Sequence, residues 1–133
     1  MSKRVVLIIQ ARMGSTRLPG KSMMDLAGKP LVGRILERVS RCKLVDEVVL
    51  AIPDTAENKC LEVLCEHYSA KVFKGSEDNC LDRYYQAAIS FGAEIIGRLP
   101  ADNPVPEPSE IDRAIQHYQH KGYKGFCSNL AEI

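Results

Sequence analysis

The chain has 133 residues, which is enough for one domain with a hydrophobic core and too few for two full-sized domains. Its 18 basic and 17 acidic side chains are interspersed and give a formal net charge of +1. A chain without a strong field of either sign is a poor candidate for binding nucleic acid or an anionic membrane surface. We therefore expect residues 1–133 to form a single domain whose partners are small molecules or proteins.

The N-terminal segment and the cysteines bear on localisation. The first apolar run stops at Gln10, too early for a signal-peptide core or a membrane span. The five cysteines are an odd number and contain neither a C-x-x-C pair nor a zinc-binding spacing. These features predict a cytoplasmic protein, not inserted in a membrane, whose reduced thiols pack as small apolar groups without a catalytic role.

Short apolar runs predict the strands. Residues 5–9 form a continuous run rich in β-branched side chains, which is typical of a strand buried on both faces of a parallel sheet. Further strands are predicted over 45–52, 71–74 and 94–99. A last short strand is expected near Gly125.

Helical spacing of apolar residues predicts a helix after each strand. The first is expected over 30–42, with Pro30 in its first turn. The second follows Asp54, which with Glu57 can form its N-terminal cap. The fourth is expected to begin with Ser109 as its cap. The third helix carries the apolar residues Leu81, Tyr84, Tyr85, Ala88 and Ile89.

The alternation of strands and helices favours an α/β fold. About four such units in a row indicate a Rossmann-like, mainly parallel sheet with right-handed crossovers and helices on both faces. Ligands of such sheets bind beyond the carboxyl ends of the strands. The loops that start at Ala11, Pro53, Gly75 and Pro100 are therefore expected to share one rim that contains the functional site.

The loop after the first strand has the composition of a polyphosphate site. It runs from Gln10 to Lys21 and contains three cations, two glycines and two hydroxyls. Glycine allows backbone N–H groups to approach phosphate oxygens, and cations neutralise the charge on departing pyrophosphate. The alternative is a solvated basic turn on the surface. The cations are Arg12, Arg17 and Lys21.

Two familiar phosphate-binding loops do not match this segment. Gly20-Lys21-Ser22 resembles the end of a P-loop, but that motif requires glycine where this chain has Ser15. The dinucleotide fingerprint G-x-G-x-x-G is absent after the first strand. A P-loop enzyme and a nicotinamide-dependent enzyme are both disfavoured.

The same loop resembles the signature A-R-x-G-S-x-R-x-x-x-K of the CMP-sugar synthetases, which include the 3-deoxy-manno-octulosonate and acylneuraminate cytidylyltransferases. Residues 75–85 and 98–104 agree with that family as well, and the chain looks closest to its spore-coat polysaccharide, SpsF-like branch. The resemblance covers essentially the whole chain but only about the first half of the family's length. It implies a truncated nucleotide-diphospho-sugar transferase fold.

The resemblance also implies roles for particular residues. Arg12, Arg17 and Lys21 are expected to bind the CTP phosphates, and the backbone of Ala11, Gly14 and Ser15 is expected to lie near the nucleotide. Asp102 is expected to hold a Mg²⁺ ion that bridges phosphates, as suits a hard carboxylate at the end of a strand. The alternative for Asp102 is a turn cap before Pro104. The expected catalytic residues are Arg12, Lys21 and Asp102.

Residues at the start of the third helix are further candidates. Asp78, Asp82 and Arg83 are expected on the same rim, where they would contact the base or the sugar. The alternatives are that Asp78 caps the helix and that Asp82 and Arg83 belong to its solvated face.

The implied reaction is the transfer of CMP from CTP to a hydroxyl of an acidic or related sugar, with release of pyrophosphate, in surface polysaccharide or glycan biosynthesis. Positioning and charge neutralisation would drive it, without a covalent intermediate. Family members have a second half that contributes to the acceptor pocket and to a homodimer contact. Two alternatives stay open: a shortened nucleotide-binding module without transferase activity, and a nucleotidyltransferase or glycosyltransferase that uses another nucleotide.

Overall fold

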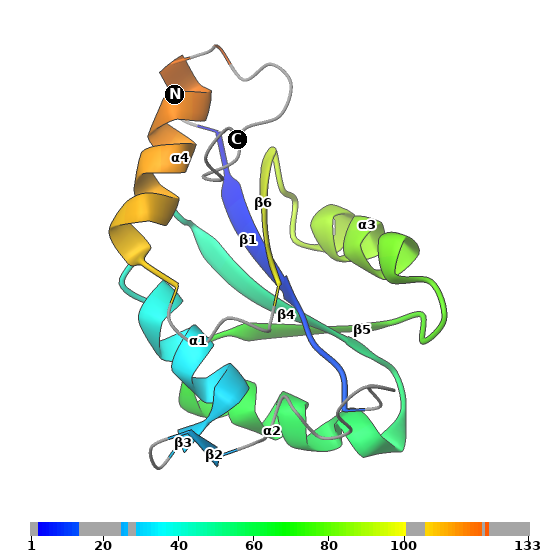
Figure 1. Cartoon of the computed structure of the whole chain (residues 1–133). Coiled ribbons are helices and arrows are strands. Elements are labelled where there is room, and N and C mark those ends of the chain that lie inside the picture. Colours follow the sequence, from blue (N-terminus) through cyan, green and yellow to red (C-terminus); the bar gives the residue numbers. More distant parts are fainter. Residues whose placement is uncertain (1–2, 14–24, 27–28, 101–105, 121, 123–133) are drawn as a thin grey trace, which may run out of the picture.

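The computed structural model describes residues 3–13, 25–26, 29–100, 106–120 and 122. In this part of the chain, parallel strands form a four-stranded sheet in the order β5-β4-β1-β6 (Figure 1). The strands are β1 (Val5–Gln10), β4 (Glu47–Pro53), β5 (Lys71–Gly75) and β6 (Ile95–Pro100). The four predicted strands are thus confirmed, with ends that shift by one or two residues. The strand expected near Gly125 lies outside the described residues.

Strand β1 lies inside the sheet because its side chains are apolar on both sides. Ile8 pairs in register with Val49 of β4 on one side and with Arg98 of β6 on the other. The five residues from Val5 to Ile9 are all buried. A run of β-branched residues without polar alternation suits this position, because both faces of the strand are covered by helices.

Within the described ranges, five helical segments connect or follow the strands. They are α1 (Leu31–Val39), the 3₁₀ helix η2 (Ala56–Asn58), α2 (Lys59–His67), α3 (Cys80–Ser90) and α4 (Pro108–His120). A small antiparallel pair, β2 (Asp25–Leu26) and β3 (Lys29–Pro30), precedes α1 and was not expected from the sequence. Pro30 is the N-cap residue of α1, and its φ of −59° already suits a helix start. None of the described helices is long and apolar enough to cross a bilayer.

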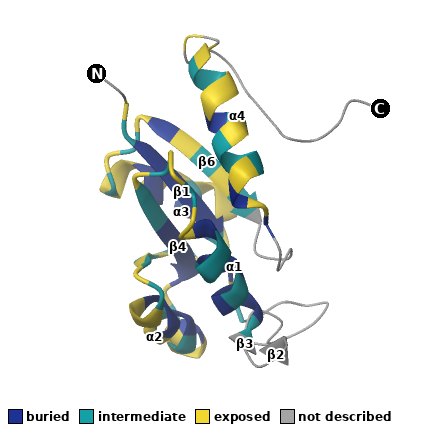
Figure 2. Ribbon diagram, turned by 90° about the vertical axis from the view of Figure 1, so that its left-hand side faces the viewer, coloured by how far each residue is buried: buried dark blue, intermediate teal, exposed yellow. Residues whose placement is uncertain are grey.

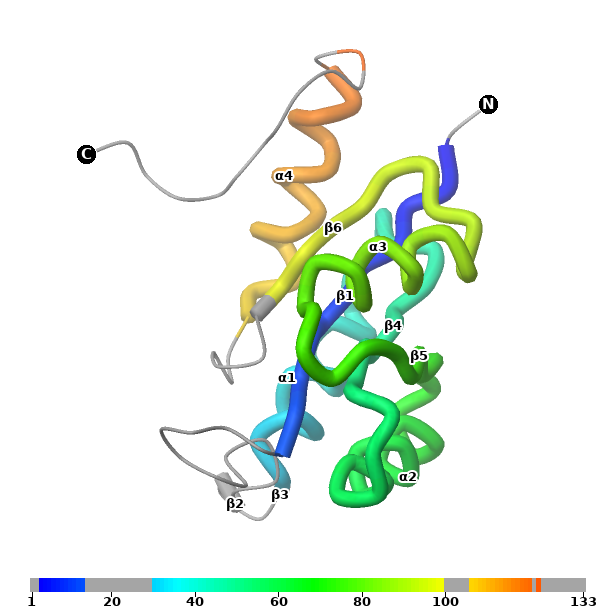
Figure 3. The backbone as a smooth tube through the Cα atoms, turned by 90° about the vertical axis from the view of Figure 1, so that its right-hand side faces the viewer, coloured from blue at the N-terminus to red at the C-terminus, as the bar shows by residue number. Residues whose placement is uncertain are grey.

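The helices cover both faces of the sheet (Figures 1 and 2). Helices α1 and α2 pack on the face that carries Leu7, Ile9, Leu50 and Ile52. Helix α3 packs on the opposite face, formed by the alternate residues of β1 and β4. Figure 3 shows α3 in front of β1 and β4 on that second face. The predicted α/β class with helices on both faces is confirmed.

Helix α4 packs near the amino ends of β1 and β6 through Ile115, which contacts Val5 and Ile95. Its start is tied to the end of α1 and the following turn. The Asp112 carboxylate accepts hydrogen bonds from the backbone N–H groups of Lys43 and Leu44 at 2.9–3.0 Å. These contacts bring segments together that are almost 70 residues apart in sequence.

Two expected helix caps, Asp54 and Ser109, are wrong, and so is the alternative that Asp78 caps the third helix. Asp54 donates its backbone N–H to Gly75 and does not begin a helix, because the chain first forms η2. Ser109 lies inside α4, which already begins at Pro108. Asn79, next to Asp78, caps α3 by accepting a hydrogen bond from Asp82 N at 2.9 Å.

Helix α3 exposes most of its large apolar side chains. Leu81, Tyr85 and Ile89 are 76, 58 and 57% exposed, although they follow helical spacing. The buried side of α3 consists of Arg83, Ala87 and Ala88. Small alanines allow the helix to lie close against the β-branched surface of the sheet, and this contact turns the bulkier residues outward.

The described cysteines are free thiols, and two of them have perturbed acidity. Burial raises the pKa of Cys65 to about 11, with the nearby Glu62 charge as a second cause. Burial likewise raises the pKa of Cys42 to about 11, assisted by Asp112. Cys65 packs in the core as expected, whereas Cys80 at the start of α3 is exposed.

Two isoleucines provide a matched test of this core. Ile8 is 0% exposed and Ile89 is 57% exposed. We expect Ile8→Val to lower the free energy of unfolding by about 1 kcal/mol, because it removes a buried methylene group. Ile89→Val should change it by less than about 0.5 kcal/mol. Urea unfolding followed by circular dichroism measures both values, and equal losses would contradict the burial of β1.

The thiols should differ in reactivity. With a pKa of about 11, Cys42 and Cys65 hold only about one thiolate per thousand molecules at pH 8. We expect iodoacetamide to modify Cys80 well before either of them, as measured by peptide mass spectrometry. Their modification should rise about tenfold per pH unit between pH 8 and 10. In urea, where the chain is unfolded, Cys65 and Cys80 should react at similar rates. Equal rates in the folded protein would contradict the burial of Cys65.

Candidate functional site

The carboxyl ends of the four strands form one rim. Because the strands are parallel, the segments that follow Gln10, Pro53, Gly75 and Pro100 all leave from the same edge of the sheet. Gln10 pairs with Pro100, and Pro53 pairs with Gly75. The backbone N–H of Asp54 donates to Gly75 O at 2.9 Å and joins two of these segments. The predicted common rim is therefore present.

The first residues of the predicted phosphate loop are anchored on both sides of Arg12. The backbone N–H of Ala11 donates to Ala51 O of β4 at 3.1 Å, and Ala11 is buried. The backbone N–H of Met13 donates to the Asn58 side-chain oxygen at 2.8 Å. Arg12 lies between these two hydrogen bonds, and its side chain is exposed. The fold thus presents one cation at the rim on a short, fixed piece of backbone.

Asn58 is a buried polar residue that sequence analysis missed. It is 1% exposed, and its side-chain nitrogen donates to Thr55 Oγ1 at 2.6 Å. The turn of η2 brings Thr55 and Asn58 together, because they lie three residues apart. A threonine followed by asparagine at this spacing, directly after a buried strand, was the only signal in the sequence, and it points to a local turn as readily as to a site.

The segment between β5 and α3 is held by its own side chains. The backbone N–H of Asn79 donates to Ser76 Oγ at 3.1 Å, and Asn79 in turn caps α3. Asp78 and Asp82 are both exposed near the start of α3. Their carboxylates are thus available to solvent or to a ligand at this edge of the sheet.

Arg83 does not lie on a solvated face, because it is 1% exposed. Its Nη1 donates to Ser76 O at 2.7 Å and its Nη2 contacts Cys80 Sγ at 3.5 Å. Its Nε has no hydrogen-bond partner, and no carboxylate in the described part of the chain pairs with it. A Cβ atom at Gly75 would lie 3.1 Å from Arg83 Cγ and 2.8 Å from a ring carbon of Phe73. Arg83 therefore holds the loop after β5 through Ser76 O while shielded from solvent, and its expected contact with the base or sugar remains a prediction.

The remaining predicted site residues lie outside the described residues. They are Gly14, Ser15, Arg17, Lys21 and Asp102. Among the residues that the structure describes, no three His, Cys, Asp or Glu side chains gather in a way that would hold a metal ion. The roles expected for these five residues remain predictions.

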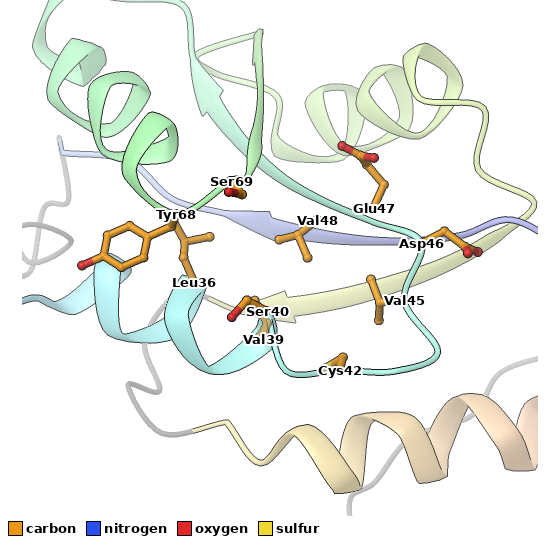
Figure 4. Close-up of a pocket in the computed structure, with 10 residues that line it drawn as sticks. All are labelled: Leu36, Val39, Ser40, Cys42, Val45, Asp46, Glu47, Val48, Tyr68 and Ser69. Atoms are coloured by element: carbon orange, nitrogen blue, oxygen red, sulfur yellow. The ribbon is translucent and has the colours of Figure 1, made fainter.

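A cavity of about 220 Å³ lies at the opposite end of the sheet (Figure 4). It is lined by the end of α1, the start of β4 and the segment at Tyr68. Its two carboxylates already have partners: Asp46 accepts the Val5 N–H at 2.7 Å, and Glu47 pairs with Arg4 at 3.6 Å. The cavity is at the amino ends of the strands and is separate from the rim that presents Arg12.

Comparison with known proteins gives close sequence relatives. The chain matches the cytidylyltransferase family over residues 6–133. It is 40% identical over 113 residues to a 3-deoxy-manno-octulosonate cytidylyltransferase of Geobacter sulfurreducens, covering 84% of this chain and 44% of that protein. It is 36% identical over 122 residues to the spore coat polysaccharide biosynthesis protein SpsF of Bacillus subtilis, covering 89% and 51%. The chain thus spans about half the length of the relatives it matches.

Solved structures agree with the sequence relatives. A cytidylyltransferase from Leptospira borgpetersenii superposes with a TM-score of 0.85 at 31% identity, over 90% of this chain and 50% of that one. CMP:2-keto-3-deoxy-manno-octonic acid synthetase, solved in complex with CTP, superposes with a TM-score of 0.78 at 27% identity, over 90% and 48%. The parallel sheet, its anchored first loop and these matches together identify the chain as a member of the cytidylyltransferase family of nucleotidyltransferases.

Proposed function

We propose that this chain provides the nucleotide-binding half of a site that transfers CMP from CTP to a sugar hydroxyl. The observation that carries the proposal is the position of Arg12, an exposed cation held at the carboxyl rim by hydrogen bonds on both sides. This rim is where parallel α/β sheets bind ligands. CTP is the nucleotide bound in the solved structure of the related synthetase, which supports it as the substrate here.

The reaction is an in-line displacement at phosphorus. The sugar hydroxyl oxygen forms a bond to the α-phosphorus of CTP while the bond to the bridging oxygen of the β-phosphate breaks. Pyrophosphate leaves with that electron pair, and the hydroxyl proton passes to water. Arg12, together with Arg17 and Lys21, would neutralise the charge that accumulates on pyrophosphate. The backbone N–H groups of Ala11, Gly14 and Ser15 would bind phosphate oxygens.

Asp102 is the residue proposed to hold Mg²⁺. It follows β6 by two residues, as Arg12 follows β1, and the last residues of these strands, Gln10 and Pro100, are paired in register. The two side chains thus come from segments that start at neighbouring positions on the rim. An aspartate carboxylate is a hard oxygen ligand that suits Mg²⁺ next to phosphate. The ion would supply further neutralisation of phosphate charge.

Asp78 and Asp82 are proposed to contact the base or the sugar. Both are exposed carboxylates, which accept hydrogen bonds from an amino group or a hydroxyl and repel phosphate. The acceptor is proposed to be an acidic or related sugar destined for a surface polysaccharide or glycan, because a spore coat polysaccharide protein and the octulosonate enzymes are relatives. Its pocket would involve the part of the fold that these relatives have in addition.

Nucleotide titration by calorimetry tests this proposal. We expect CTP to bind in the presence of Mg²⁺ more tightly than UTP, ATP or GTP. Arg12→Ala should weaken CTP binding about 10- to 100-fold, because it removes a charged hydrogen bond to phosphate. Asp102→Asn should reduce the amount by which Mg²⁺ increases the affinity for CTP. Arg113→Ala is the matched control, because Arg113 is an exposed arginine of α4 whose ion pair is with Glu110 of the same helix.

The outcomes separate the candidates. Selective, Mg²⁺-dependent CTP binding without CMP transfer would favour the nucleotide-binding module without transferase activity. Tighter binding of another nucleotide than of CTP would favour the alternative of a nucleotidyltransferase or glycosyltransferase that uses that nucleotide. No binding of any nucleotide, or equal effects of Arg12→Ala and Arg113→Ala, would refute the proposed site.

A further inference from the structure

We propose that Asn58 is a positioning residue that fixes the start of the phosphate loop and thereby aims Arg12 at the nucleotide phosphates. This inference rests on the proposed function. It assigns a role to a side chain that lies in a different loop from the phosphate-binding residues. The juxtaposition that carries it is a hydrogen bond between residues 45 positions apart, Met13 N to Asn58 Oδ1 at 2.8 Å.

The anchor is rigid because both ends of the Asn58 amide are engaged. Its oxygen accepts the Met13 N–H, and its nitrogen donates to Thr55 Oγ1 at 2.6 Å. The backbone N–H of Asn58 also donates to Thr55 O at 3.1 Å, which holds the turn that carries the side chain. At 1% exposure the side chain is shielded from water, so no solvent molecule competes freely for these bonds.

The anchor acts on Arg12 through the backbone. Ala11 is hydrogen-bonded to β4, and Met13 packs against the same core that contains Ala11. Only one residue, Arg12, lies between the β4 bond and the Asn58 bond. Loss of the Asn58 bond would leave one end of this three-residue segment free to shift. A shift of about 1 Å would misalign the charge-assisted hydrogen bond from Arg12 to phosphate, and loss of such a bond lowers affinity by about one to two orders of magnitude.

The other end of β1 offers a matched control. The Asp46 carboxylate accepts the backbone N–H of Val5 at 2.7 Å, across 41 residues. This contact is of the same kind as the Asn58 bond and involves the same strand, but it lies at the amino end, away from the rim. Both anchors contribute to stability, whereas Asn58 alone is placed to influence phosphate binding.

The experiment compares Asn58→Ala, Asn58→Leu and Asp46→Ala in the 133-residue chain. The leucine variant keeps the branched shape and the number of non-hydrogen atoms of the side chain, so that it separates the hydrogen bond from a cavity effect. Calorimetry gives the affinities for CTP and for CMP in Mg²⁺. We expect both Asn58 variants to lose CTP affinity about 10-fold and CMP affinity less than about twofold, because only CTP carries the β- and γ-phosphates that Arg12 is proposed to bind. Asp46→Ala should leave both affinities unchanged while lowering the melting temperature.

Amide hydrogen exchange measured by NMR tests the anchor independently of nucleotide. The Met13 amide should exchange at least about 10-fold faster in the Asn58 variants, and the Val5 amide should do so in Asp46→Ala. CTP and CMP affinities that fall by the same factor, or Met13 protection that is unchanged, would overturn the inference. If the wild-type chain binds neither nucleotide, the proposed function and the role of Asn58 in aiming Arg12 are both refuted. Faster hydrogen exchange of the Met13 amide in the Asn58 variants would still support the anchor itself.

Discussion

The hydrogen bonding of β1 to β4 on one side and to β6 on the other is the constraint on which the rest of the structure depends. It places an apolar strand with five buried residues at the centre of the molecule, so that helices must cover both faces. These pairs are parallel, as is the pair of β4 with β5, so the carboxyl ends of all four strands lie at one edge. Each chemically interesting loop leaves from that edge, and the distance between these loops is set by strand pairing and not by the loops themselves.

Polar side chains buried near this edge have a different role from the apolar core. Asn58 satisfies a backbone N–H of the first loop, and Arg83 satisfies a backbone carbonyl of the loop after β5. Among the described residues Arg83 has no carboxylate partner, and a buried guanidinium in this state stabilises the fold less than apolar packing of the same space would. Asn58 and Arg83 each hold the shape of a loop, which is the pattern expected where a ligand must be bound in a defined geometry.

The match to the cytidylyltransferases covers about half of each relative, and the described structure explains why this half retains its fold. The core formed by β1, β4 and the surrounding helices lies entirely within the chain. Helix α3 exposes Leu81, Tyr85 and Ile89 to solvent. The proposed nucleotide site needs the rim, whereas the proposed transfer needs an acceptor pocket as well.

The amino-acid sequence by itself determined the α/β class, the four parallel strands and the basic loop after the first strand, because these depend on local periodicity and on the order of elements. It also contained the family signature around Arg12. Only the tertiary structure decided which residues anchor the loops. Strand pairing brings the Asn58 side chain to the backbone N–H of Met13. The direction in which α3 leaves β5 buries Arg83 against the backbone carbonyl of Ser76. Neither pattern nor propensity carries that information, since an asparagine or an arginine in a loop or first helical turn is exposed by default until packing makes it otherwise.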